Sequence, residues 1–539
     1  MDTNEIITAE TAGTEPLSLL FPDPEKRAPG MTKSADAARD LGFSAWFSMK
    51  NGELSDFFAA DAATVEYRQA TVRDVTEVPG VLAALSKCVP VMSDIVDVRR
   101  LSSGTESADE YLYGITEVEL YLSLLEILSH DLLPLKGELS SPAMKGLCSR
   151  IETLTQSEKY REINERLKEL TYRVREIKSV TVGVNLDGRL FPESAGVLSV
   201  NNGTFRAPSS FDRILRINQR QEENTFIAPM VKTAKSFNDY ESEGLRRSVL
   251  SALGTVFKSG FKSWKQIIRS FILLNTDFMM GILPEIEFLS LAGAFISGLK
   301  ERGVALTYPK VRDDGTVLRA KGLVNPRIAL LAETEPVPND ADFDENGKIY
   351  VVTGPNRGGK SVFTCAVGQA VVAASLGLPV CADEFELSLC DNVFCHFPTA
   401  EEDTIDKGRL GEECARLSSI IDEATSKSVV LLDESLSSTG SYEATAIAEE
   451  VLSGLSVLGV RAVFSTHLHA LAAEVPEINE RTAPLGGVKI DTLVADIASG
   501  ERSFRIRRAA PEGKSYASDI AKKYGLSLDR ILEKAGRGE

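Results

Sequence analysis

The spacing of apolar positions changes its period along the chain. From about residue 35 to 134, and again from about 239 to 302, apolar side chains recur at helical intervals. Amphipathic helices are predicted at 35–50 and around 65–75. After residue 303, short apolar runs alternate with helical stretches, which favours a largely parallel sheet covered by helices. Core surface in the first stretch is expected from Leu120, Leu122, Leu124, Leu125 and Leu128.

Between the two helical stretches lies a charged segment without glycine, at 157–178. Its narrow apolar seam, typical of one arm of a coiled coil, is formed by Ile163, Leu167, Leu170 and Val174. Alternating apolar positions then predict a β insert at about 179–205, with Asp187 and Gly188 as its turn. The pattern therefore predicts an outgoing helical arm, a small β tip and a returning arm.

The firmest strand candidates of the last part are 349–353, 429–432 and 462–465, which are continuous apolar runs. The run 304–308 is a weaker candidate, because it is short and Pro309 follows it at once.

A glycine-bracketed loop follows the strand at 349–353 and leads into an apolar helix. Backbone N–H groups of such a loop can surround phosphate oxygens, while Lys360 can reach the β- and γ-phosphates and the Ser361 hydroxyl can bind Mg²⁺. A structural glycine turn is the alternative, but a strand before and a helix after are what a phosphate loop requires. ATP and Mg²⁺ are therefore the predicted ligands. The loop consists of Gly354, Pro355, Asn356, Arg357, Gly358, Gly359, Lys360 and Ser361.

The strand predicted at 429–432 ends in two carboxylates, Asp433 and Glu434. In phosphate-loop ATPases an acid at this place holds the magnesium shell, which is the role predicted for Asp433. Glu434 would orient or deprotonate the attacking water. A solvated strand end is the alternative for such a pair in isolation, and the phosphate loop upstream favours the catalytic interpretation.

The strand predicted at 462–465 leads to Thr466 and His467. Because the carboxyl ends of parallel strands share one edge of a sheet, His467 is expected beside the phosphates, where it could sense the γ-phosphate or the attacking water. His469 is expected to be a surface or packing residue.

Composition limits the partners of the chain. Its 539 residues are 43% hydrophobic and 26% charged, with a formal net charge of −18. A net negative charge of this size repels the phosphates of nucleic acid, so any DNA contact must be local or made inside a dimer.

One basic stripe on the returning arm is a candidate for such a contact, because no acidic residue lies between Gly244 and Thr276. A solvated face, or one paired with acids such as Glu165 and Glu169, is the commoner origin of such a stripe. Its members, at helical spacing, are Lys258, Lys262, Lys265 and Arg269.

Seven scattered cysteines favour reduced thiols over a disulfide framework. The absence of a Cys-x-x-Cys pair argues against zinc at Cys381, Cys390, Cys395 and His396. With neither an apolar run of membrane-spanning length nor a signal-peptide pattern, we expect a cytoplasmic protein without membrane contact.

These motifs resemble the MutS family of DNA mismatch-repair ATPases. The segment 353–361 resembles its phosphate loop, 433–443 its second motif with the loop after it, and 464–467 its histidine motif. The segment 338–340, with Asn339, is similar to its adenine-side loop. Further likenesses are at 377–394 (its next strand), 513–526 (its closing helices) and 66–69 (its helical core).

The resemblance implies a homodimer whose ATPase domains pack head to tail, each completing the nucleotide site of its partner, with levers that clasp DNA. The family's trans-acting loop corresponds to Gly408, Arg409, Leu410 and Gly411, but Gly408 or Leu410 replaces its serine. That departure implies slower hydrolysis or a loop that serves mainly as a dimer contact. Core-like residues begin near residue 40, so the family's N-terminal mismatch-reading domain is not expected.

We therefore predict a multidomain protein with an all-α core and lever, a small β insert and an α/β phosphate-loop ATPase domain. The predicted parts are a flexible or peripheral segment at 1–34, a helical core at 35–134, lever helices at 135–302, and an ATPase domain with a C-terminal helical dimerisation segment at 303–539. The predicted function is an ATPase that dimerises and binds structured or branched DNA in repair or recombination, with repair proteins as partners.

Two alternatives remain. One is a nucleotide-switched clamp or assembly ATPase that acts on a protein without binding DNA. The other, the ATPase subunit of a membrane transporter, is disfavoured by the long helical part upstream and by the lack of a Leu-Ser-Gly-Gly segment.

Overall fold

The structure is a computed structural model. It describes residues 16–25, 30–102, 109–158, 160–162, 164–165, 178–186, 188, 192–204, 277–332, 335–398, 408–498, 501–510, 530 and 534. These residues belong to two units, each described by itself. The first takes in the described residues of 1–17, 83–138 and 145–286, and the second those of 18–82, 139–144 and 287–539.

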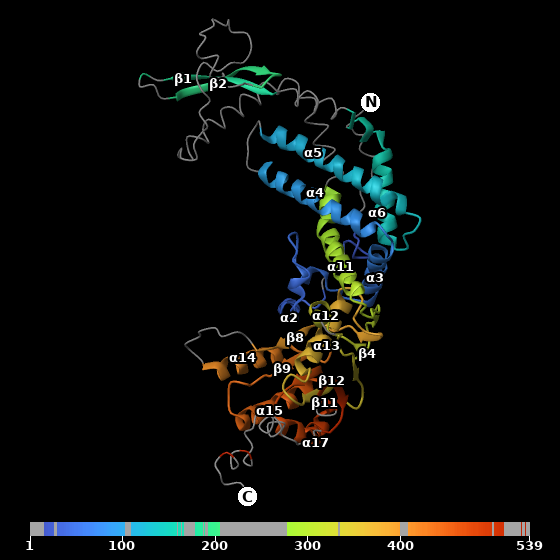
Figure 1. Cartoon of the computed structure of the whole chain (residues 1–539), viewed down its shortest axis with the longest axis vertical. Helices are drawn as coiled ribbons and strands as arrows, with labels where there is room; N and C mark the ends of the chain where they lie inside the picture. Colours follow the sequence, from blue (N-terminus) through green and yellow to red (C-terminus); the bar gives the residue numbers. More distant parts are fainter. Residues whose placement is uncertain are drawn as a thin grey trace. The chain divides into compact units, whose positions relative to one another are not determined.

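The first unit is mainly helical (Figure 1). Its elements are α4 (Val81–Ser102), α5 (Asp109–Ile127), a π-helical turn (Leu128–Leu132), a 3₁₀ turn (Leu133–Leu135), α6 (Pro142–Gln156) and α10 (Asp277–Gly281), of which α4 and α6 begin in the second unit. Helix α11 (Leu283–Glu301) starts in the first unit, but most of it belongs to the second. Leu122, Leu124, Leu125 and Leu128 are buried, and Leu120 is half-buried. The predicted contribution of this leucine-rich stretch to the core is thus confirmed.

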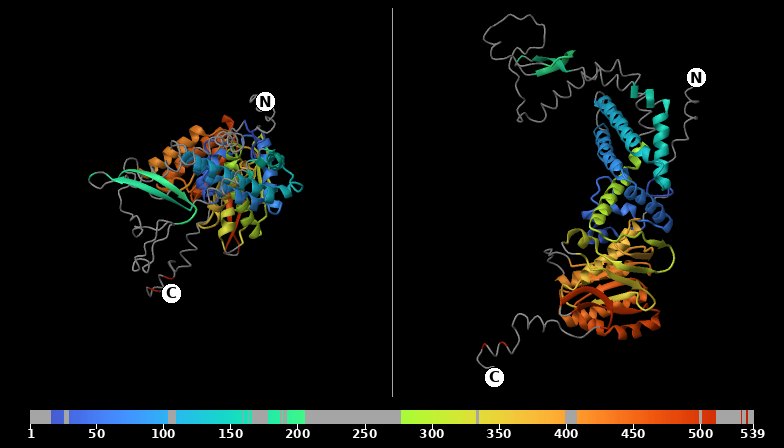
Figure 2. Two further views of the ribbon diagram at one scale, coloured as in Figure 1. Left: turned by 90° about the horizontal axis from the view of Figure 1, so that it is seen from above. Right: turned by 45° about the vertical axis from the view of Figure 1, so that its right-hand side comes forward.

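A two-stranded hairpin also belongs to the first unit and appears as a pair of green arrows in Figure 2. Its strands, β1 (Ser179–Leu186) and β2 (Pro192–Asn201), pair antiparallel. Across them the Ser199 hydroxyl donates to the Thr181 hydroxyl over 2.9 Å. These strands lie where the alternating pattern predicts a β insert. The predicted turn residue Asp187 lies outside the described residues.

The second unit begins with short helical elements, α2 (Ala35–Asp40), 3₁₀ turns at Phe43–Ala45 and Leu54–Phe57, and α3 (Ala62–Glu77). The helix predicted at 35–50 is confirmed only for its first part, because α2 ends at Asp40. Gly42 has a φ of 88°, a left-handed conformation that stops the helix and turns the chain. That turn lets the aromatic ring of Phe47 stack on the ring of Phe288, with centroids 5.6 Å apart.

A six-stranded sheet forms the centre of the second unit, in the order β12-β11-β6-β10-β9-β8. The strands are β6 (Ile349–Thr353), β8 (Val393–His396), β9 (Val429–Asp433), β10 (Arg461–Ser465), β11 (Ile490–Ala498) and β12 (Glu501–Arg508). All neighbouring pairs are parallel except β11 with β12. The largely parallel sheet predicted from the sequence is therefore confirmed.

Helices cover both faces of this sheet. One face packs against α13 (Lys360–Ser375), where Gly368 lies close to Leu431. Alternate residues of the same strands, such as Val430 and Phe464, share an apolar cluster with helices of the other face. Those helices are α14 (Gly408–Glu423), α15 (Ser441–Leu458), α16 (His469–Ala473) and α17 (Val475–Thr482), which is followed by a 3₁₀ turn at Ala483–Leu485.

A smaller mixed sheet, not predicted from the sequence, lies in the same unit. Its order is β3-β7-β4-β5, formed by β3 (Lys310–Arg312), β4 (Leu318–Leu323), β5 (Asn339–Phe343) and β7 (Glu384–Ser388), with α12 (Pro326–Leu331) after β4. The segment 377–394, expected as one strand, contributes to both sheets through β7 and β8. The strand expected at 304–308 is wrong, because only Thr307 forms a bridge there, with Val380.

None of the described helices is both long and apolar enough to span a bilayer. All seven cysteines fall within the described residues and are free thiols.

Candidate active site

The loop between β6 and α13 has a backbone that glycine alone fits well. Gly354 and Gly359 have φ values of 133° and 96°. A β-carbon on Gly354 would lie 2.7 Å from the Ala495 β-carbon, and one on Gly358 would lie 2.8 Å from the Pro355 carbonyl oxygen. Glycine is thus required at these two positions because the loop packs closely against Ala495 and against its own backbone.

Lys360 is the first residue of α13, and its ammonium group points into the loop. Its Nζ donates to the carbonyl oxygens of Gly354 and Pro355, over 3.1 and 3.2 Å. Burial lowers the pKa of Lys360, and the carboxylates of Glu434 and Asp433 oppose that shift. A cation held at the helix start in this way can contact a phosphate bound by the loop.

Asp433, at the end of β9, lies beside the start of α13. The Ser361 hydroxyl donates to Asp433 Oδ1 over 2.9 Å, and the Ser465 hydroxyl donates to the same oxygen. Burial raises the pKa of Asp433, while the two hydroxyl donors oppose that shift. Strands β9 and β10 are neighbours, so the sheet order itself brings Ser465 to this carboxylate.

The oxygens of Ser361 and Asp433 fit a Mg²⁺ ion, which prefers hard oxygen ligands. Among the described residues, no group of three or more His, Cys, Asp or Glu side chains is arranged to hold a metal ion. Phosphate oxygens and water would therefore have to complete the shell, as in phosphate-loop sites generally.

Glu434 and His467 face each other at the same edge of the sheet. His467 Nε2 lies 2.8 Å from Glu434 Oε1, and both side chains are partly exposed. Glu434 has a φ of 46°, which is strained for a residue other than glycine. Its backbone N–H donates to the Ser465 carbonyl over 2.9 Å, which holds the strained turn in place. The two residues predicted to be catalytic are thus brought together.

A cavity of about 570 Å³ extends from the phosphate loop and is large enough for a nucleotide. Asn339 anchors one wall, because its side chain accepts from the Ile506 N–H over 2.6 Å and donates to the Phe504 carbonyl over 3.1 Å. The rings and apolar groups of Phe504, Val337 and Ile328 also line the cavity.

Phe504 was not predicted from the sequence, although its side chain is 47% exposed and lines this cavity. Its only signal is an aromatic residue between Ser503 and Arg505 on a strand of charged residues. Only the pairing of β12 with β11 brings that strand beside the phosphate loop.

The four residues predicted to act on a partner's site form the first turn of α14. The helix begins at Gly408, and Leu410 packs on the apolar cluster of the second unit. Leu410 is thus partly covered within the chain, whereas Arg409 and Gly411 are exposed. His469 begins α16 and is exposed, in line with the surface position predicted for it.

The predicted basic stripe of Lys258, Lys262, Lys265 and Arg269 lies outside the described residues.

A buried histidine adjoins the acidic strand end and was not predicted to belong to the site. His396 Nδ1, at the end of β8, lies 2.7 Å from the hydroxyl of Ser435, the residue after Glu434. His396 is 2% exposed, and burial lowers its pKa to about 4. It is therefore neutral at physiological pH and holds Ser435, the residue after Glu434, in place.

Two family models match this chain. MutS domain V matches residues 350–535, and the MutS2 N-terminal domain matches residues 60–279. A DNA mismatch repair protein MutS from Streptococcus mutans is 30% identical over 204 residues, 38% of this chain and 23% of that protein. An endonuclease MutS2 from Streptococcus pyogenes is 29% identical over 249 residues, 46% of this chain and 29% of that protein. The aligned part thus spans less than a third of the length of these curated relatives.

Proposed function

The chain belongs to the MutS family, and we propose that it binds and hydrolyses ATP with Mg²⁺. One observation carries the proposal: the ends of β6, β9 and β10 bring Lys360, Asp433, Glu434 and His467 to one edge of the sheet, beside a glycine loop and a nucleotide-sized cavity.

The residues divide the work of the reaction. Lys360 and the loop N–H groups would bind the phosphates, and the apolar wall with Phe504 and Asn339 would hold the base. Glu434 would take a proton from the attacking water. The contact with His467 would orient the Glu434 carboxylate for this step. Ser361 and Asp433 would hold Mg²⁺, whose positive charge would offset the negative charge of the phosphates.

We further propose that two copies associate through this domain. Gly408, Arg409 and Gly411 would reach the nucleotide site of the partner from the first turn of α14. Tyr442, at the start of α15 after the acidic strand end, is 88% exposed and offers a large apolar contact. An exposed aromatic side chain of this kind is typical of an interface.

We also propose that the protein acts on structured or branched DNA in repair or recombination. Support comes from the similarity to MutS and MutS2 proteins and from the basic stripe in the sequence. The net charge of −18 favours the alternative partner, a protein, so DNA binding has to be tested separately from ATP hydrolysis.

Replacement of Lys360 tests the ATPase proposal. Lys360→Ala removes the only ammonium group that points into the loop in the described residues, so ATP affinity should fall and turnover should drop at least about a hundredfold. Phosphate release and binding of a fluorescent ATP analogue measure the two effects. Lys321→Ala, which removes an exposed lysine of β4, is the matched control. Unchanged nucleotide affinity in Lys360→Ala would contradict the assignment.

A further inference from the structure

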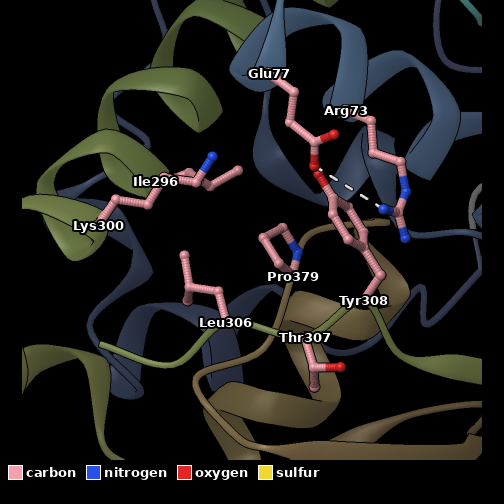
Figure 3. Close-up of a pocket in the computed structure, with 8 residues that line it drawn as sticks. All are labelled: Arg73, Glu77, Ile296, Lys300, Leu306, Thr307, Tyr308 and Pro379. Carbon is pink, nitrogen blue, oxygen red and sulfur yellow. Dashed lines mark ion pairs between the residues drawn. The ribbon is translucent and has the colours of Figure 1, made fainter. Parts of the chain in front are cut away.

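A second cavity of the same unit, of about 310 Å³, shares no lining residue with the nucleotide cavity. Residues of α3, α11, the segment 306–308 and Pro379 line it (Figure 3). Pro379 lies just beyond the C-terminal end of α13, whose first residue is Lys360. The two cavities therefore lie at opposite ends of one helix.

The walls of this cavity carry more positive than negative charge. Figure 3 shows Lys300 on one side and Arg73 on the other, with Glu77 as the single carboxylate among the labelled residues. Arg73 and Glu77 form only a loose ion pair, with 3.9 Å between nitrogen and oxygen, and both side chains are about half exposed. A ligand carboxylate or phosphate could replace Glu77 as the partner of the guanidinium at little cost.

The guanidinium of Arg73 is already held in position. It lies over the ring of Tyr308, 3.7 Å from the ring centroid, and at its edge the Glu77 carboxylate makes only the loose contact of 3.9 Å, so an anion could compete for its N–H groups. Burial raises the pKa of Tyr308, so its phenol stays protonated. On the opposite side, Lys300 Nζ makes a long contact of 3.4 Å with the Thr76 carbonyl. A stronger acceptor such as an anion would compete well for that ammonium group.

One part of the cavity lining is held by hydrogen bonds and carries an apolar patch. Thr307 and Val380 exchange two backbone hydrogen bonds, of 2.9 and 2.8 Å, and Gln69 donates to the Pro309 carbonyl over 2.9 Å. Leu306, Ile296 and Pro379 supply apolar surface beside these fixed segments. The lining as a whole exposes more polar than apolar surface, so this apolar patch can support only part of a ligand.

We propose that this cavity binds a small organic anion. Its carboxylate or phosphate lies between Lys300 and Arg73, and its apolar body rests on Leu306 and Pro379. The volume is at the lower end of the range for ligand pockets, which fits a ligand with one ring or a short chain. This site is independent of the proposed ATPase activity.

Fluorine NMR titration of the full chain with 4-(trifluoromethyl)benzoate tests the proposal. The uncharged 4-(trifluoromethyl)benzyl alcohol, of nearly the same shape, should bind at least about tenfold more weakly. The double variant with Arg73→Gln and Lys300→Gln should lose affinity for the benzoate by a similar factor. Its matched control, Arg319→Gln with Lys321→Gln, removes two exposed cations of β4 that do not line the cavity.

Two further variants test whether the benzoate binds in this cavity and not elsewhere on the protein. Leu306→Trp fills the cavity but keeps both cations, so it should abolish binding, whereas Lys360→Ala alters only the phosphate loop and should leave binding unchanged. Melting curves establish that each variant is folded. The proposal is overturned if the wild type does not bind, if the alcohol binds equally well, if a folded cavity variant binds normally, or if Lys360→Ala abolishes binding.

Discussion

At the scale of single residues, the acidic strand end combines two opposed electrostatic requirements. Asp433 is buried beside Glu434, which disfavours its charge, yet two hydroxyl donors on one oxygen stabilise the carboxylate. Glu434 is more exposed and contacts a histidine instead. One carboxylate is thereby suited to a cation and the other to a proton, although they are adjacent in sequence.

Replacement of Glu434 should separate ATP binding from hydrolysis. Glu434→Ala leaves Lys360, Ser361 and the loop intact, so ATP should still bind while turnover falls on the order of a hundredfold. Glu450→Ala, on the exposed face of α15, is the control. Retained turnover in a clean Glu434→Ala preparation would show that another residue is the base.

The buried His396 should make stability depend on pH. Its folded pKa of about 4 is below the usual 6.5, so the unfolded chain binds more protons between those values. The stabilisation is complete above pH 6.5 and is lost as pH falls toward 4, by up to about 3 kcal/mol in the free energy of unfolding.

The variant His396→Gln removes this titration, so the loss of stability between pH 6.5 and 4 should become smaller. Urea unfolding at a series of pH values measures it. His130→Gln, at a histidine whose side chain is 87% exposed, should keep the wild-type slope. Equal slopes for His396→Gln and the wild type would contradict the assignment.

At the scale of elements, helix ends and turns set the boundaries around the site. Asn325 caps α12 by accepting from the N–H groups of Arg327 and Ile328, and its amide also donates to the Val362 carbonyl of α13. α12 is therefore fixed to the helix that begins at the phosphate loop. Asp61 caps α3 in the same way, by accepting from the Thr64 N–H over 2.7 Å.

The N-terminal cap of α3 should contribute measurably to the free energy of unfolding. Asp61→Ala should lower the free energy of unfolding by about 1 kcal/mol, because the Thr64 N–H then loses its acceptor. Asp61→Asn should retain most of that stability, and Glu66→Ala, an exposed change inside the helix, should have little effect. Urea titrations of all three compare them. If Asp61→Asn is as unstable as Asp61→Ala, the charge and not the cap is responsible.

At the scale of the whole molecule, the chain consists of a mainly helical unit and a unit that contains the proposed ATPase site. The net charge of −18 requires that any DNA contact be confined to a basic surface. ATP-dependent association and DNA binding are both proposed here for the full chain, and both are measurable in a variant that binds ATP without hydrolysing it.

Glu434→Ala protein with ATP should bind one branched or mismatched DNA more tightly than linear or single-stranded DNA, with an affinity that falls as salt rises. Neutralising the basic stripe, Lys258, Lys262, Lys265 and Arg269, to glutamine should weaken binding and reduce the salt slope. Neutralising Arg39, Lys50, Arg319 and Lys321, exposed cations of the second unit, is the control. Absence of binding to every form at low salt would instead favour a protein partner.

The sequence predicted much of the ATPase part because that part is encoded locally. Continuous apolar runs fix β6, β9 and β10, and the spacing of glycines, Lys360 and Ser361 fixes the loop between strand and helix. Prediction from the sequence failed where several short elements share one segment, as at 35–50 and 377–394. In the first segment a left-handed glycine ends the helix, and in the second the chain passes from one sheet to the other. Neither change alters the spacing of apolar residues from which the elements were predicted.

The sequence by itself therefore determined the family, the largely parallel sheet and which residues end its strands. Only the tertiary structure decided that Ser465 and Ser361 share one oxygen of Asp433, that Phe504 lines the cavity beside the glycine loop, and that Lys300 and Arg73 line a second cavity. The physical reason is that these contacts join residues far apart in the chain. Their distances depend on strand order and helix packing, which the local spacing of apolar residues does not encode.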